Sequence, residues 1–202
     1  MAKFIHSYSQ ICQDICVFKI LDSNSGNFLD IGSNLPVILN NTFLFESHGW
    51  VGMCIDKLNY TDFYKQVRKC TYICGDALIE IPNLIEKHYN YISIDIDESS
   101  TDALRVLLKN NIKFDILTIE HDSYIHGKSY QNNQHQLLYS HGYLPLFVDI
   151  YPHWCNDRIF EDWWYNPKAN LTVIDELINM DIVGTKHISD TEIVQILFEN
   201  SI

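Results

Sequence analysis

Basic residues are scarce in this 202-residue chain. Lys and Arg together number 14 against 26 Asp and Glu, which leaves a formal net charge of -12 at pH 7. Proteins that bind a nucleic-acid backbone usually meet its phosphates with clusters of Lys and Arg. The charge balance therefore argues against DNA or RNA as a partner.

Long apolar runs are also missing. No stretch approaches the roughly 20 apolar residues needed to span a bilayer. The segment that begins Met1-Ala2-Lys3 continues into polar residues and not into the apolar centre of a signal peptide. We therefore expect a soluble, cytoplasmic protein without a membrane span.

Signals that would divide or crosslink the chain are absent. The six cysteines form no C-x-x-C pair, which is the spacing typical of zinc sites and redox pairs. The sequence contains no internal repeat, low-complexity tract or linker rich in proline and glycine. With 47% hydrophobic residues, the chain is long enough for one domain with a substantial core. We expect free thiols and a single domain over residues 1–202.

Acidic residues stand at the ends of three apolar segments that are typical of strands. Asp30 belongs to the first of these segments, Asp56 closes the second, and Asp76 follows the third. The carboxyl ends of parallel strands form the edge at which open α/β sheets bind ligands. We expect Asp30 to hold an ammonium group and Asp56 to accept hydrogen bonds from ribose hydroxyls. Asp76 is expected to accept from an adenine amino group.

The glycine pattern distinguishes between two nucleoside ligands. A dinucleotide site requires G-x-G-x-x-G at the start of a helix to bind a pyrophosphate, but here Gly32 is followed by Ser33, Asn34, Leu35 and Pro36. The missing side chain of Gly32 lets the backbone approach a ligand closely. S-adenosylmethionine (SAM) carries a sulfonium and an amino-acid tail but no phosphate. The sequence therefore favours SAM over NAD.

Strand and helix signals alternate as in a parallel sheet that is covered by helices on both faces. The expected strands are 27–31, 51–55, 71–74, 91–95, 115–120, 143–149 and 158–164, and the expected helices are 7–21, 39–48, 59–67, 79–88, 100–110, 129–140, 171–179 and 190–199. This order predicts an α/β, Rossmann-like fold with a mostly parallel, seven-stranded sheet.

Two further strand ends carry a concentration of carboxylates and one imidazole. Asp95 and Asp97 lie on the same side of an extended segment, and Glu120, His121 and Asp122 close the next strand. Such a group is unfavourable unless a cation occupies it. We expect His121, Asp97 or Glu120 to take the proton of an acceptor hydroxyl. In a second interpretation Asp97, Glu120, His121 and Asp122 bind Mg²⁺ or Mn²⁺, and in a third the acids only cap helices or face water.

Aromatic residues gather in the second half of the chain. They are Tyr124, Tyr130, Tyr151, Trp154, Trp163 and Trp164. Flat apolar faces with polar edges suit sugar rings. The alternative is a place in the core, which we favour for at least one of Trp163 and Trp164.

A series of short motifs resembles the FkbM-type SAM-dependent methyltransferases over nearly the whole chain. The motifs are Tyr8-Ser9-Gln10, Phe28-Leu29-Asp30-Ile31-Gly32-Ser33-Asn34, Asn40-Asn41-Thr42, Gly49-Trp50-Val51-Gly52, Ser93-Ile94-Asp95-Ile96-Asp97, Thr118-Ile119-Glu120-His121-Asp122, and Phe160-Glu161-Asp162-Trp163-Trp164. The resemblance implies a class I methyltransferase fold and transfer of a methyl group to oxygen, commonly on a sugar or a related hydroxylated acceptor.

The resemblance also implies which residues line the SAM pocket. By the match of motifs these are Tyr8, Ser9, Gln10, Asp30, Gly32, Asn41, Thr42, Asp56, Asp76 and Asp95, with helix 7–21 covering the site. The chain departs from the family pattern at Cys12 and Gln13, where Gly and Glu are frequent. It also has Asp56-Lys57 in place of Glu-Pro, so a shorter acid reaches for the ribose.

Size and motif order are also similar to methyltransferase domains that are joined to glycosyltransferases in large DNA viruses of algae. This similarity implies a deoxysugar such as rhamnose on a glycan as the acceptor, glycosyltransferases as fused or separate partners, and the host cytoplasm as the location. Two other functions stay open. One is a non-catalytic SAM-fold subunit, and the other is an NAD-dependent sugar oxidoreductase.

Overall fold

One mixed β-sheet forms the centre of the protein. The computed structural model describes residues 6–156 and 158–199. Within these residues eight strands pair in the order β3-β2-β1-β4-β5-β7-β6-β8. The strands are β1 (Asn27–Ile31), β2 (Val51–Asp56), β3 (Thr71–Cys74), β4 (His88–Ile94), β5 (Lys113–Glu120), β6 (Leu144–Tyr151), β7 (Glu161–Tyr165) and β8 (Thr185–Ser189).

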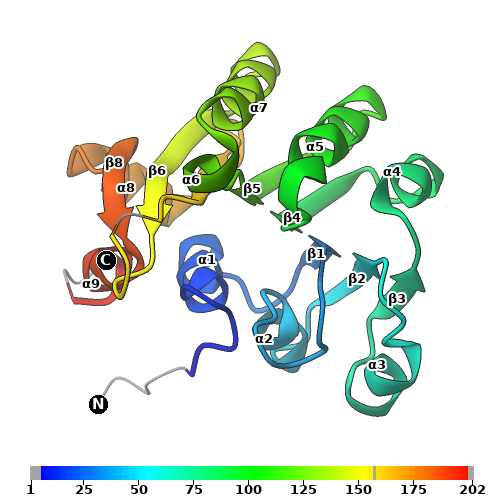
Figure 1. Cartoon of the computed structure of the whole chain (residues 1–202). Helices are drawn as coiled ribbons and strands as arrows, with labels where there is room; N and C mark the ends of the chain where they lie inside the picture. Colours follow the sequence, from blue (N-terminus) through cyan, green and yellow to red (C-terminus); the bar gives the residue numbers. More distant parts are fainter. Residues whose placement is uncertain (1–5, 157, 200–202) are drawn as a thin grey trace.

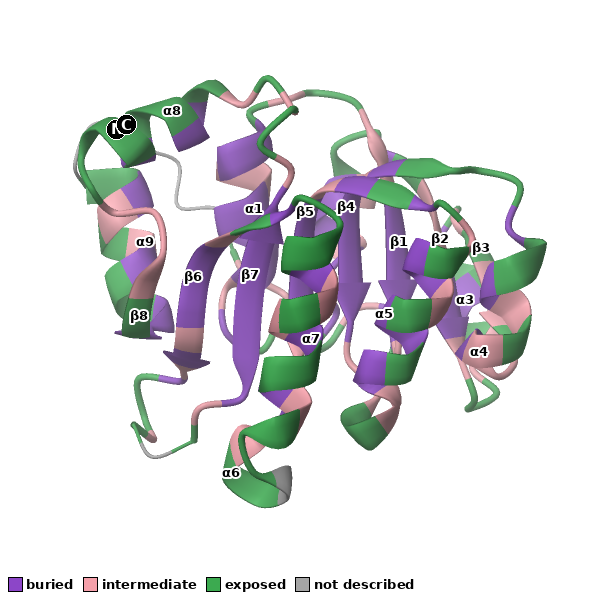
Figure 2. Ribbon diagram, turned by 90° about the horizontal axis from the view of Figure 1, so that it is seen from above, coloured by how far each residue is buried: buried purple, intermediate pink, exposed green. Residues whose placement is uncertain are grey.

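Helices cover both faces of the sheet (Figures 1 and 2). One face packs against α1 (Gln13–Leu21), α2 (Phe43–Ser47), α3 (Thr61–Val67), α8 (Thr172–Asn179) and α9 (Asp190–Glu199). The other face packs against α4 (Ala77–Glu80), η1 (Ile81–Asn83), α5 (Ser100–Lys109) and α7 (Ser129–Ser140). The short elements η2 (Asp97–Ser99) and α6 (Ser123–His126) follow β4 and β5.

Seven of the described strands run in one direction. Strands β1 to β5 pair in parallel, β7 is antiparallel to both β5 and β6, and β6 pairs in parallel with β8. The carboxyl ends of these seven strands therefore meet at one edge, which we call the carboxyl rim. The predicted α/β architecture with a mostly parallel sheet is confirmed. The predicted number of seven strands is wrong, because β8 adds an eighth.

Successive side chains along each strand point to opposite faces of the sheet and so contribute to two hydrophobic cores, one on each face. Phe28 points to the face of α1 and α2, whereas Leu29 and Ile31 point to the face of α5, as expected for a period of two. The same alternation puts Trp163 and Trp164 on opposite faces, and neither has any exposed surface. The core interpretation therefore holds for both tryptophans.

The first helix is shorter than the predicted 7–21. The carboxylate of Asp14 accepts hydrogen bonds from Tyr8 N at 2.7 Å and from Ser9 Oγ at 2.8 Å. These bonds fold the preceding segment into an irregular turn, and Cys12 adopts a left-handed backbone with φ of 62° just before α1 begins. Local side-chain bonds thus compete with the helix.

Two other helices also differ from the prediction. The expected helix 79–88 is replaced by α4 and η1, since Pro82 lacks the N–H that an α-helix needs there. The expected helix 39–48 begins only at α2, because Asn40 Oδ1 accepts from Thr42 N at 3.1 Å and from Phe43 N at 2.8 Å. Strand β8 was not predicted, because Ile188 is its one apolar residue.

All six cysteines are free, as predicted.

No helix in residues 6–156 and 158–199 combines the length and the apolar character that crossing a bilayer requires.

The contact between Gly32 and the end of β4 predicts that the substitution Gly32→Ala, which adds one methyl group, strongly lowers the stability of the fold. A Cβ at Gly32 would lie 1.7 Å from the carbonyl oxygen of Asp95, at φ of +84°, whereas a Cβ at Gly142, at φ of +82°, would meet nothing within 4 Å. Both alanine variants share the cost of the left-handed backbone. We expect Gly32→Ala to lower the free energy of unfolding by about 2 kcal/mol more than Gly142→Ala, because of overpacking.

Urea unfolding followed by circular dichroism measures this difference. Equal losses in the two variants would show that the chain relaxes around the new methyl group and that the contact is not tight.

Candidate functional site

A cleft of about 460 Å³ opens at the carboxyl rim, over the ends of β1 to β4. Its walls include Gln10, Gly32, Asp56, Asp95 and Asp97. These five residues come from four separate segments of the chain, and all were predicted as site residues. The cleft lies where parallel α/β sheets bind nucleosides.

Asp56 stands at the tip of β2 with both carboxylate oxygens fixed. Oδ2 accepts from Asn34 N at 2.8 Å, and Oδ1 accepts from Leu58 N at 2.8 Å. The backbone on either side therefore holds the carboxylate in one orientation. Each oxygen has a further lone pair available for a ligand hydroxyl.

Asp76 is not among the residues that line the cleft. Its carboxylate caps α4 by accepting from Leu78 N, and it lies 3.6 Å from Lys57 Nζ. Lys57 itself lines the cleft. The neighbours of Asp76, which are Gly75 and Ala77, line the cleft as well, so Asp76 lies at the border of the cleft.

Gly32 approaches the protein's own backbone more closely than expected from the sequence. Its N–H donates to Ile55 O at 2.8 Å, and the carbonyl of Asp95 occupies the place of a side chain. The glycine therefore brings the ends of β1 and β4 together. The cleft wall depends on that contact.

Asp30, Asn41 and Thr42 are buried behind the cleft wall. Thr42 Oγ1 donates to Asp30 Oδ2 at 2.8 Å, and Asn41 Nδ2 donates to Ser93 Oγ at 2.9 Å. Burial raises the pKa of Asp30 to about 7, although Thr42 and Arg68 oppose the shift. These residues connect the segment after β1 to the sheet.

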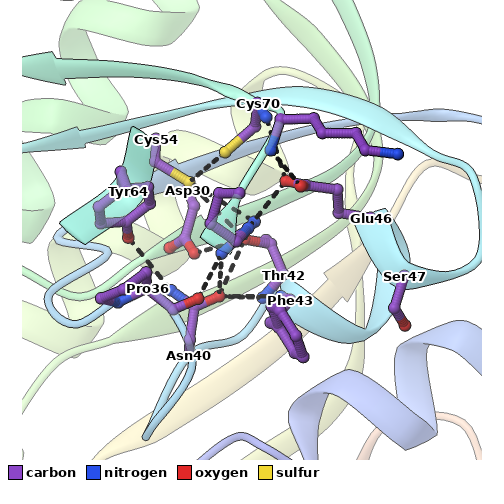
Figure 3. A network of polar contacts seen from close by, with 12 residues as sticks. Asp30, Pro36, Asn40, Thr42, Phe43, Glu46, Ser47, Cys54, Tyr64 and Cys70 are labelled. Atoms are coloured by element: carbon purple, nitrogen blue, oxygen red, sulfur yellow. Dashed lines mark hydrogen bonds and ion pairs between the residues drawn. The ribbon is translucent and has the colours of Figure 1, made fainter. Parts of the chain in front are cut away.

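The buried guanidinium of Arg68 organises this segment. Figure 3 labels its partners Pro36, Asn40, Thr42 and Glu46. Nε donates to Glu46 Oε2 at 2.8 Å, and Nη1 donates to Pro36 O and Asn40 Oδ1, both at 2.9 Å. Nη2 lies 3.2 Å from Thr42 Oγ1. The side chain of Arg68 has no exposed surface. Sequence reasoning missed this residue, and only the scarcity of arginine, with three in the chain, could have drawn attention to it.

The segment before α1 packs on the same region. Asn40 N donates to Tyr8 O at 3.0 Å, and the rings of Tyr8 and Phe43 meet edge to face at 4.7 Å. Gln10 lines the cleft, whereas Ser9 bonds to Asp14. Of the three predicted residues in this segment, Gln10 is therefore the one that lines the cleft.

Three carboxylates form a group beside the cleft, which we call the acid group. It consists of Asp97, Glu120 and Asp122, which offer oxygen atoms within 4.8 Å of one another. Asp97 also lines the cleft. Both Asp97 and Asp122 adopt left-handed backbones, with φ of 51° and 43°, a strain that clusters at functional sites.

The acid group carries the charge repulsion that the sequence predicts. Burial first, and then the neighbouring Asp95 carboxyl, raise the pKa of Glu120 far above its usual range. Burial also raises the pKa of Asp95. No donor in the described part of the chain reaches the buried Glu120 Oε2. A proton or a cation is therefore needed to balance these carboxylates.

His121 lies apart from the acid group. Its Nδ1 accepts from Ser123 N at 3.1 Å, and its Nε2 lies 3.4 Å from Asp162 Oδ1. Neither side chain of this pair has exposed surface. Of the four predicted metal ligands, the structure groups Asp97, Glu120 and Asp122, and it turns His121 toward β7.

Asp162 accepts several further bonds in the interior. His135 Nε2 lies 2.6 Å from Oδ2, and Gln131 Nε2 and Asp149 N also donate to this carboxylate. Burial raises the pKa of Asp162, but the bonds from His121 and His135 outweigh it and hold this pKa below its usual range. His121, Asp149 and Asp162 are close enough to share an ion. However, Asp162 already accepts from Gln131 and Asp149 N and contacts His135 Nε2, and Asp149 Oδ1 accepts from Gln131, so other groups already occupy both carboxylates.

Comparison with known proteins gives the fold. No protein-family model and no curated protein sequence matches the chain. A candidate caffeoyl-CoA O-methyltransferase from Staphylococcus aureus is similar in structure, with a TM-score of 0.57, 16% identity, and coverage of 80% of this chain and 86% of the other.

Two further structures contain S-adenosylhomocysteine (SAH). An O-methyltransferase from Bacillus cereus gives a TM-score of 0.51 at 14% identity, covering 79% of this chain and 81% of its own. The N-methyltransferase NodS from Bradyrhizobium japonicum WM9 gives 0.51 at 11% identity, covering 77% and 86%. The chain therefore has the α/β, Rossmann-like fold of class I SAM-dependent methyltransferases.

The network of Arg68 predicts that lysine cannot replace it. Arg68→Lys keeps the charge but loses the planar set of donors that reach Glu46, Pro36 and Asn40. We expect the free energy of unfolding to fall by about 3 kcal/mol, as for other broken buried pairs. The exposed Arg105, which pairs with Asp102 on α5, provides the matched control Arg105→Lys. Chemical unfolding checks both, and similar small losses would contradict an organising role for Arg68.

Proposed function

We propose that this protein is a SAM-dependent O-methyltransferase that methylates a hydroxyl group of a sugar. One observation carries the proposal: Asp97 belongs both to the cleft at the ends of β1 to β4 and to the acid group. A nucleoside donor in the cleft and an acceptor hydroxyl at the acid group are then direct neighbours. This adjacency is what a transfer reaction needs.

The donor side rests on the residues of the cleft. Asp56 accepts hydrogen bonds from the ribose hydroxyls, since its orientation is already fixed by two backbone N–H groups. Gln10, Gly32 and Asp95 border the rest of the donor. Asp30, Asn41 and Thr42 support the wall from behind. When bound, SAM supplies a methyl group on a positively charged sulfur, and its loss as a methyl cation equivalent leaves neutral SAH.

The acceptor side rests on the acid group. Asp97 takes the proton of the acceptor hydroxyl, because it is exposed and borders the donor cleft. Burial and Asp95 raise the pKa of Glu120, and its hydrogen bond with Asp95 connects the acid group to the wall of the cleft. The buried side chain of His121 holds the backbone that carries Glu120 and Asp122, since Nδ1 accepts from Ser123 N and Nε2 lies 3.4 Å from Asp162 Oδ1. Positioning of this kind is worth about 7 to 11 kcal/mol of the barrier.

A divalent cation also fits the acid group. Three carboxylates and the unpartnered Glu120 Oε2 provide the hard oxygen ligands that Mg²⁺ and Mn²⁺ prefer. Asp97, Glu120 and Asp122 would hold the ion, which supplies positive charge that lowers the pKa of a nearby hydroxyl.

A sugar acceptor is supported by the aromatic side chains near the rim and by the motifs. Tyr124 and Trp154 are both exposed, and such rings suit sugars. The motif resemblance to the FkbM-type enzymes, and to domains joined to glycosyltransferases, favours a deoxysugar such as rhamnose, a glycosyltransferase partner and a location in the cytoplasm.

Donor binding is tested by Asp56→Ala. The lost hydrogen bonds to a charged acceptor are worth about 1.5 to 3 kcal/mol, so the dissociation constant for SAM should rise by roughly 10- to 150-fold. Calorimetry with SAM, and with NAD in parallel, measures it. Asp102→Ala on the exposed surface of α5 is the control and should bind normally. Unchanged SAM affinity in Asp56→Ala, or tighter binding of NAD than of SAM in the wild type, would reject the donor site.

Methyl transfer is tested by mass spectrometry of rhamnose-containing glycans incubated with protein and labelled SAM. Asp97→Asn should reduce turnover by about 10²- to 10⁴-fold, as for loss of a general base, while SAM affinity stays near the wild-type value. A chelator should also reduce turnover if the cation is present, with Mn²⁺ restoring it. Turnover that resists both changes would remove the acid group from the reaction.

A further inference from the structure

A second hollow opens at the carboxyl rim, where β6 and β8 end. It measures about 540 Å³, is broadly open to solvent, and is lined by Tyr151, His153, Trp154, Asn156, Ser189, Thr191 and Glu192. Aromatic faces lie here beside hydroxyl, amide and carboxylate groups. This combination suits a sugar ring, which has apolar faces and a polar edge.

Trp154 is the unusual member of this hollow. It is 57% exposed, whereas Trp50, Trp163 and Trp164 are buried. Its ring combines a large apolar face with a polar N–H, and it borders the hollow. Within the described residues, Trp154 is thus the tryptophan that a ligand in solution can reach.

The neighbouring His153 makes the hollow rigid. His153 N donates to Asp190 Oδ1 at 2.8 Å, and its Nδ1 lies 3.1 Å from both oxygens of the same carboxylate. Asp190 is only 2% exposed. The rings of His153 and Trp154 meet edge to face at 5.0 Å, so the start of the loop that carries Trp154 is fixed.

The hollow and the acid group share one edge of the sheet. Strands β6 and β8 lie two and three places from β5 in the sheet, which is roughly 10 and 14 Å at the usual strand spacing. The segment 152–160 begins at the hollow and ends at Phe160, whose carbonyl accepts from His121 N at 2.7 Å and from Asp122 N at 3.2 Å. Along it, the guanidinium of Arg158 lies 5.8 Å from the ring centre of Tyr124.

We propose that this hollow, the distal subsite, binds an inner sugar of the acceptor while the terminal sugar lies at the acid group. The inference rests on the proposed function, and it adds that the acceptor is an oligosaccharide, because the span exceeds one sugar ring. The acceptor is neutral, since the acid group and a net charge of -12 disfavour anionic glycans. Trp154 stacks on a sugar face in the distal subsite.

Fluorescence tests the subsite without donor or turnover. Acrylamide should quench Trp154 in the wild type, and the Trp154→Phe variant should lack this accessible fraction. Rhamnose and fucose oligosaccharides should protect wild-type emission from acrylamide, and the monosaccharides at equal concentration should protect much less. Absence of protection by every oligosaccharide, or equal protection by the monosaccharides, would overturn the proposal. Protection in a protein that transfers no methyl group would keep the subsite and reject the proposed reaction.

Kinetics test how the subsite is used. Trp154→Ala should raise KM for the oligosaccharide acceptor by about three- to tenfold, the worth of one aromatic contact, and leave kcat and the KM for SAM unchanged. Trp154→Phe should restore most of the loss. Phe63→Ala, on the exposed side of α3, is the control and should match the wild type. An equal loss for monosaccharide and oligosaccharide acceptors would contradict a distal subsite.

Discussion

The hydrogen-bonded guanidinium of Arg68 is the buried interaction on which the wall of the cleft depends. A charged group inside a protein is tolerated when each donor finds an acceptor, and Arg68 bonds to Glu46, Pro36 and Asn40. These partners lie on the segment after β1 and on α2. The same segment carries Asn34, whose N–H holds Asp56 in place. The arginine thus acts at a distance on the carboxylate that faces the cleft.

A second buried charged group has the corresponding role beside the acid group. Asp162 on β7 receives bonds from α7, β6 and the segment after β5. His121 is the link between this carboxylate and the acid group. The imidazole that looked like a proton acceptor in the sequence is better explained as the residue that sets where Glu120 and Asp122 stand. Each part of the rim therefore depends on a buried charged side chain with several hydrogen bonds, which is Arg68 for the cleft and Asp162 for the acid group.

Much of the fold could be predicted because the pattern along the chain is local. The bounds of β1 and α7 agree with 27–31 and 129–140, and α5 lies within the predicted 100–110, where Ala103, Leu104, Leu107 and Leu108 follow the helical period. Errors arose where side chains or proline interrupt a helix, as at Asp14 and Pro82, and where β8 offers a single apolar residue to the core.

The candidate site was predictable in the same uneven way. Asp56, Asp95 and Asp97 reach the cleft because strand ends of a parallel sheet share an edge. The orientation of the His121 side chain could not be predicted from the sequence, since it depends on Asp162, 41 positions away along the chain. The importance of Arg68 was hidden for a similar reason, because its partners Pro36 and Asn40 become neighbours only after folding.

The reversed direction of β7 has a consequence for how such a protein can change. Because β7 runs against β6, the two are joined by a hairpin whose turn lies on the rim and does not cross a face of the sheet. His153 bonds to Asp190 at one end of that connection and Phe160 packs in the core at the other, so the part that can change without disturbing α9 or the core is its middle, near Asn156. Remodelling of that external stretch alters the surface beside the acid group, while the cleft, which is built from the first half of the chain, is inherited intact.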